Sequence, residues 1–179
     1  MRYIVGYSRK LHFFARAIMW FTKSDKSHCY IRQVGSTIEE TKKVDYVLEA
    51  NKRGVNLQWH SVFLREGAIV VKEYVVNVDE DVLTQAWADT NYELLNRPYS
   101  YMQIFGDAWV ILVNWLTGRR VKNPLGQPWK DVCSEALLFF LKKAKLPLYT
   151  PLDLQTVSPQ DIDLIMSNDP QCTEIPVER

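Results

Sequence analysis

The chain has 179 residues, of which 47% are apolar and 24% are charged, and its formal net charge is +1. This length and composition are typical of a single soluble globular domain with a sizeable core. A nearly neutral charge balance gives no reason to expect nucleic acid or an acidic membrane as a partner.

The three cysteines, Cys29, Cys133 and Cys172, are odd in number and share no CxxC spacing. This pattern argues against a disulfide framework and a structural zinc site, so we expect no metal, no cofactor and a reducing compartment. The apolar stretch at 11–21 carries basic side chains and precedes no small-residue cleavage site, unlike a secretory signal. We therefore expect a cytoplasmic or virion-associated protein.

The most hydrophobic segment spans residues 101–116 and contains Asp107 and Asn114. It is shorter than the roughly 20 apolar residues that a membrane-spanning helix needs. We interpret it as a buried helix. A role at a membrane surface is the alternative, which the sequence does not favour.

The first half of the chain is predicted to form strands. Runs of β-branched, aromatic or alternating residues occur at 2–7, 28–34, 44–50, 55–59 and 68–78. Gly35 is expected to end the second run. The Asn-Lys-Arg-Gly sequence at 51–54 is typical of a hairpin turn.

The second half is predicted to form helices. Acidic residues from Asp79 suit a helix start, and further helices are expected at 101–116, at 132–145 and from Ser158. Strands followed by helices predict an α+β fold, with an antiparallel sheet packed against helices. We expect one domain at 1–167, with 1–26 as an added N-terminal segment and 168–179 as a loosely ordered tail.

Cys133 is the most informative residue for function. It lies in the first turn of a predicted helix that Asp131 can cap, where backbone N–H groups lower a thiol pKa and can stabilise an oxyanion. The dipole contributes only about 0.3–1 kcal/mol, so a catalytic thiolate also needs an imidazolium partner. The alternative is a small buried thiol that packs at the helix base, and position alone favours this alternative.

His28 opens a strand after a polar turn, where an imidazole can act as a general base. Glu49 ends the next strand and could orient that imidazole if the two strands pair. The alternatives are a histidine satisfied by turn carbonyls and an ordinary charge at a strand end. A zinc site from His28, Cys29 and Cys133 is conceivable, but adjacent strand residues point to opposite faces, which argues against it.

Five short motifs occur in an order that resembles the circularly permuted NlpC-like cysteine hydrolases. These are relatives of the lecithin:retinol acyltransferase branch of the papain-like superfamily. In the unpermuted members the cysteine precedes the histidine, whereas here His28 precedes Cys133. The resemblance covers residues 27–163 and is carried by Ser27-His28, Leu48-Glu49-Ala50 with Gly54-Val55, Pro98-Tyr99-Ser100-Tyr101, Cys133-Ser134-Glu135-Ala136-Leu137, and Ser158-Pro159-Gln160-Asp161.

The resemblance implies a permuted papain-like α+β domain with the catalytic cysteine at a helix N-terminus. Cys133 would be the nucleophile, His28 the base and Glu49 the residue that orients the imidazole. The substrate-binding residues that it implies are Tyr99, Tyr101 and Ser134.

The implied activity is hydrolysis of an amide bond, in a cell-wall-type peptide, through an acyl-enzyme. Two alternatives stay open: a lipid acyltransferase or phospholipase with the same triad, and a non-enzymatic structural or binding protein, for example of a phage particle. We expect a monomer that binds a peptide or acyl-bearing substrate.

Overall fold

The structure, a computed structural model, describes residues 2–9, 19, 24–39, 42–51, 54–97, 113, 133–154 and 157–177. These residues form one six-stranded sheet in the order β4-β3-β2-β1-β5-β6, and every neighbouring pair is antiparallel. The strands are β1 (Arg2–Arg9), β2 (His28–Glu39), β3 (Lys42–Asn51), β4 (Gly54–Trp59), β5 (Ile69–Val76) and β6 (Cys172–Ile175).

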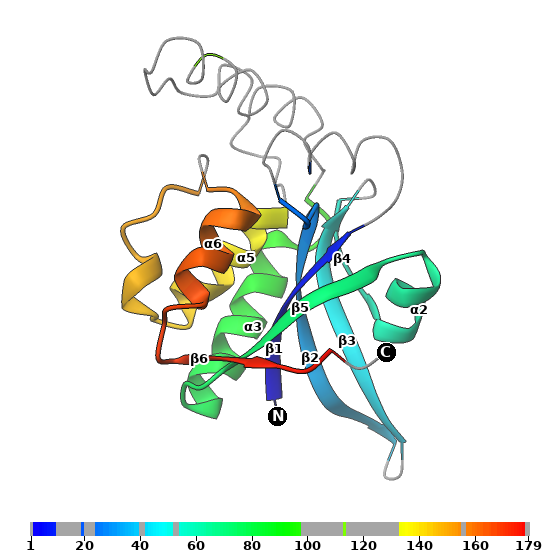
Figure 1. Ribbon diagram of the computed structural model, residues 1–179. Coiled ribbons are helices and arrows are strands. Elements are labelled where there is room, and N and C mark those ends of the chain that lie inside the picture. The colour runs from blue at the N-terminus through cyan, green and yellow to red at the C-terminus, as the bar shows by residue number, and fades with distance from the viewer. Residues whose placement is uncertain are drawn as a thin grey trace.

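Helices cover both faces of this sheet. Three of them, α3, α5 and α6, lie on one side, and α2 lies on the other (Figure 1). Their bounds are α2 His60–Arg65, α3 Glu80–Leu94, α5 Cys133–Lys143 and α6 Pro159–Met166, with a short 3-10 helix, η1, at Pro147–Tyr149. The predicted α+β class with an antiparallel sheet packed against helices is therefore confirmed.

The main core lies between the sheet and the side that carries α5. On α5, Leu137, Leu138, Phe140 and Leu141 are buried against strand residues such as Val5. A smaller cluster on the opposite face includes Tyr30, Val47 and Phe63, with the Tyr30 and Phe63 ring centroids 4.7 Å apart. Successive side chains of a strand point to opposite faces, so β2 contributes to both clusters.

Two of the predicted helix starts are capped by side chains. The side chain of Asp79 accepts hydrogen bonds from the backbone N–H groups of Asp81 and Val82 at the start of α3. Ser158 and Asp161 form a reciprocal capping box at the start of α6. None of the described helices is long and apolar enough to cross a membrane. The helix expected at 101–116 falls outside the described residues, apart from Val113.

The structure differs from the sequence interpretation in three places. β2 does not end at Gly35 but continues to Glu39, because Gly35 adopts φ +73° and the register shifts there. Residues 60–65, for which no element was predicted, form α2. The tail at 168–179, expected to be loosely ordered, contains β6.

β6 is held by backbone pairing, by polar contacts and by Cys172, which packs against the main core. It pairs with β5, its Thr173 accepts a hydrogen bond from Asn77 at 2.8 Å, and Glu174 lies 3.1 Å from Lys72. An edge strand with polar side chains lacks the hydrophobic alternation by which strands are predicted.

Candidate active site

The predicted histidine and glutamate meet at one end of the sheet. His28 is the first residue of β2, and Glu49 lies near the end of the antiparallel neighbour β3, where it pairs with Tyr30. His28 Nε2 lies 2.6 Å from Glu49 Oε2. Only 9% of His28 and 1% of Glu49 is exposed, so water does not compete for this contact.

Cys133 is the third member of this cluster. It is the first residue of α5, is 8% exposed, and interacts with the His28 side chain. Glu49 occupies Nε2 of the imidazole, so Nδ1 is the nitrogen left for the thiol. The three residues predicted as a triad are thus brought together, in the order thiol, imidazole, carboxylate.

The cluster favours the charged forms of the thiol and the imidazole. Burial alone would lower the pKa of His28, but the Cys133 thiolate and the hydrogen bond to Glu49 raise that pKa to about 10. A hydrogen bond from Cys29 and the positive charge of His28 lower the pKa of Cys133 well below its usual value, although burial opposes this shift. The arrangement suits a thiolate–imidazolium pair.

Cys29 also contacts Cys133, which the alternation of strand residues did not lead us to expect. Burial raises the pKa of the Cys29 thiol well above its usual range, so this thiol stays protonated and can donate to Cys133. His28 and Cys29 point to opposite faces of β2, but His28 is its first residue, and at this strand end Cys133 reaches both. Among the described residues, no group of three His, Cys, Asp or Glu side chains is arranged as a metal site.

Two amides that the sequence reasoning missed complete the surroundings of Glu49. Asn51 Nδ2 donates to Glu49 Oε1 at 2.6 Å, and Gln58 Nε2 donates to the same oxygen at 2.7 Å. The sequence held a usable signal for them. If the 51–54 turn closes a hairpin, Asn51 and Gln58 fall on the same face as Glu49.

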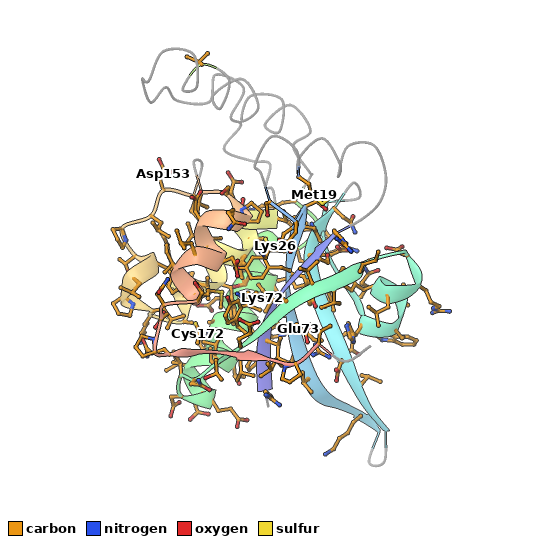
Figure 2. The ribbon with its side chains drawn as sticks, in the orientation of Figure 1. Met19, Lys26, Lys72, Glu73, Asp153 and Cys172 are labelled. Atoms are coloured by element: carbon orange, nitrogen blue, oxygen red, sulfur yellow. The ribbon has the colours of Figure 1, made fainter. Side chains whose placement is uncertain are left out.

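Salt bridges and hydrogen bonds hold the segment that leads into His28. Lys26 Nζ lies 3.1 Å from Asp163 of α6, and Lys72 of β5 lies 3.4 Å from the same carboxylate. Both lysines are labelled in Figure 2. Tyr74 donates a hydrogen bond to Asp163 at 2.8 Å, and the Ser27 N–H donates to the Ser8 carbonyl at 3.1 Å. These contacts hold Lys26 and Ser27, the two residues directly before His28, and thereby help to fix the position of His28.

The structure describes only some of the remaining predicted site residues. Ser134 follows Cys133 in α5 and is buried. Tyr99 and Tyr101 lie outside the described residues, as does Asp131, the expected cap. The described chain before Tyr99 ends at Arg97, whose carbonyl accepts a hydrogen bond from the N–H of Val55 at 2.9 Å. Val55 follows the turn next to Asn51, so the chain at Arg97 approaches the end of the sheet that carries Glu49.

Comparison with known proteins gives one distant likeness. No family model matches the chain, and no curated protein matches it. Among solved structures, it is similar to the metalloprotein yiiX from Escherichia coli O157:H7 (DUF1105), with 21% sequence identity and a TM-score of 0.49. The match covers 99% of this chain and 96% of that one. A likeness at this level does not assign a function to this chain.

Proposed function

We propose that the chain is a cysteine hydrolase that cleaves an amide bond, with Cys133 as nucleophile, His28 as acid and base, and Glu49 as the residue that orients the imidazole. The contact of His28 with both Glu49 and Cys133 carries this proposal. In this reading the domain is a permuted papain-like fold, because the histidine strand precedes the cysteine helix in the chain. A cell-wall-type peptide is the substrate that the resemblance favours.

The buried pair supports a conventional acyl transfer. The Cys133 thiolate attacks the carbonyl carbon, forming a C–S bond, and the negative charge on the carbonyl oxygen is stabilised by N–H groups at the start of α5. His28 then donates its Nδ1 proton to the leaving amine as the C–N bond breaks. Water attacks the resulting thioester, His28 accepts its proton, and the carboxylic acid product leaves as the thiolate is restored.

The proposal predicts a fast and pH-dependent alkylation of Cys133. Labelling with iodoacetamide, followed peptide by peptide by mass spectrometry, should show a rate profile with a midpoint well below about 8.5, the pKa of a free thiol. Cys172 is an internal control, because burial raises its pKa to about 11. In His28→Ala, labelling of Cys133 at pH 6.5 should slow by about 100-fold, since a shift of two pKa units reduces the thiolate fraction by that factor.

A matched histidine variant separates the effect of the Cys133–His28 pair from the effect of losing any histidine. His60 opens α2, after the far end of β4, and His60→Ala should leave the labelling profile of Cys133 unchanged. The proposal fails if Cys133 labels no faster than a free thiol, or if His28→Ala and His60→Ala behave alike.

Product analysis decides the bond that is cleaved. Release of amino groups from peptidoglycan fragments, abolished in Cys133→Ala, supports the amidase. Release of fatty acid from phospholipid vesicles by the same residues would replace it with the lipid acyltransferase or phospholipase. If neither substrate is turned over although Cys133 is reactive, a binding role in a particle becomes the better explanation.

A further inference from the structure

The carboxylate that faces His28 is held by a second layer of hydrogen bonds. Its Oε2 lies 2.6 Å from His28, while its Oε1 accepts from Asn51 at 2.6 Å and from Gln58 at 2.7 Å. We propose that Gln58 and Asn51 are positioning residues of the thiol site, which hold Glu49 so that Oε2 stays aligned with the imidazole. This inference rests on the proposed function of Cys133 and His28.

Strand register brings these side chains onto one face. Glu49 pairs with Asn56, and Gln58 pairs with Val47, two residues before Glu49. Directly paired residues share a face, as do residues two apart on a strand, so Gln58 is a diagonal neighbour of Glu49. Asn51, two residues after Glu49 on β3, lies on that face as well. The pairing of Asn51 with Gly54 sets this register, since only two residues connect β3 to β4.

Two donors on one oxygen restrict the carboxylate more than its bond to His28 alone would. A carboxylate held by a single partner can rotate about its terminal torsion, which is broad and has no strong preference. An ionised carboxylate only accepts hydrogen bonds, and the amide N–H groups of Asn51 and Gln58 meet this requirement at Oε1. Oε2 is therefore the oxygen that remains for the imidazole.

The contacts run without a break from the edge of the sheet to the nucleophile. Gln58 on β4 binds Glu49 on β3, Glu49 binds His28 on β2, and His28 contacts Cys133 on α5. Loss of the Gln58 donor should let Glu49 rotate and the imidazole tilt away from the thiol. A weaker imidazolium contact stabilises the thiolate less, so the pKa of Cys133 should rise.

The test is the pH profile of Cys133 alkylation by iodoacetamide in the full chain. In Gln58→Leu the midpoint should rise by about one pH unit, which slows labelling about tenfold at pH values below the midpoint. Asn51→Leu should act in the same direction, and the double variant should shift the profile further. Asn56→Leu is the matched control: Asn56 lies directly opposite Glu49 on the same face, and its buried Oδ1 has no hydrogen-bond partner within the described residues.

The outcomes separate this inference from the proposed function. Suppose that Cys133 labels rapidly in the wild type and slowly in His28→Ala, but that Gln58→Leu and Asn51→Leu label like Asn56→Leu. The positioning role is then wrong, and the proposed pairing of Cys133 with His28 is retained. If the wild type itself labels like a free thiol, the proposed function fails first. Circular dichroism and thermal unfolding report whether each variant is folded. Should Gln58→Leu not fold, Gln58→Thr removes the same amide from β4 with a good strand former and decides the question.

Discussion

Strand β2 carries two buried polar pairs on one face, and they differ in the kind of cation that each contains. At its start, His28 binds Glu49 of β3. Further along, Arg32 Nη2 lies 2.8 Å from Glu73 Oε2, and Tyr30 donates to Glu73 Oε1 at 2.8 Å. Both carboxylates are almost completely buried, with 1% and 3% exposed. Glu73 is labelled on β5 in Figure 2.

The difference shows what each pair can do. A guanidinium keeps its charge at every relevant pH, so the Arg32–Glu73 pair can hold three strands together but cannot move a proton. An imidazole can lose its proton, and His28 lies beside a thiol that can use it. Tyr30, which donates to the same carboxylate as Arg32, is closely packed against β1. Its ring occupies the space that a Cβ at Gly6 would need.

The largest expected effect concerns the permanently charged pair. Glu73→Ala removes the buried partner of Arg32 and leaves Asp45, 3.3 Å away and partly exposed, as its ion-pair partner among the described residues. Because the guanidinium cannot neutralise itself, the free energy of unfolding should fall by about 3–5 kcal/mol. Urea unfolding measures this loss. Alkylation of Cys133 in the folded variant should keep the wild-type pH profile.

A double variant tests the physical reason for that loss. Arg32→Met/Glu73→Leu replaces both charges with apolar side chains and should recover most of the stability, since no unpaired charge stays buried. If the double variant is as unstable as Glu73→Ala, the loss comes from packing and the comparison with His28–Glu49 loses its basis.

The reverse pattern is expected for the titratable pair. Glu49→Gln should slow the alkylation of Cys133 at pH 6.5 by about 10–100-fold, since losing one to two pKa units of stabilisation reduces the thiolate fraction by this factor. The cost in unfolding free energy should be smaller than that of Glu73→Ala, because His28 can release its proton. An unchanged alkylation rate in Glu49→Gln would mean that the two carboxylates have the same structural role.

The sequence was sufficient to predict which residues form the cluster, but not all of the contacts that they make. Cys133, His28 and Glu49 stood at recognisable ends of predicted elements, and the order of motifs linked them. The contacts of Glu49 with Asn51 and Gln58 depend on the β3–β4 register, which the turn at 51–54 made predictable. The Glu49–His28 contact depends on the pairing of β2 with β3, which the sequence left as a condition. By contrast, strand alternation did not predict that Cys133 contacts both His28 and Cys29, which point to opposite faces of β2. The contact with both is possible because Cys133 begins α5 beside the first residue of β2.

The missed elements have a common physical cause. α2 is only six residues long and follows β4 directly, without a side-chain cap at Trp59, so no local signal marks its start. β6 is only four residues long, lacks alternation of apolar and polar residues, and is fixed by its pairing with β5. Such segments take their structure from neighbours that are distant in the chain, which periodicity within a short window does not record.

The smallest expected effect is the pH dependence of stability that the thiolate–imidazolium pair contributes. The folded pKa of His28 is about 10, above its unfolded value of 6.5, so its contribution is complete below pH 6.5 and is lost as pH rises through about 10. The folded pKa of Cys133 lies below its unfolded value, so its contribution is present above about pH 8.5 and is lost as pH falls through the lowered pKa.

Between about pH 6.5 and 8.5 the two contributions have opposite slopes, because on folding His28 takes up a proton and Cys133 releases one. Stability should therefore be flat in this window and fall on both sides, by at most about 1.4 kcal/mol per pH unit for each group. Urea unfolding of the wild type and Cys133→Ala at matched pH values measures the difference. The variant should lose the fall on the acid side that belongs to Cys133, whereas a pair that is neutral in the folded protein would leave both profiles parallel.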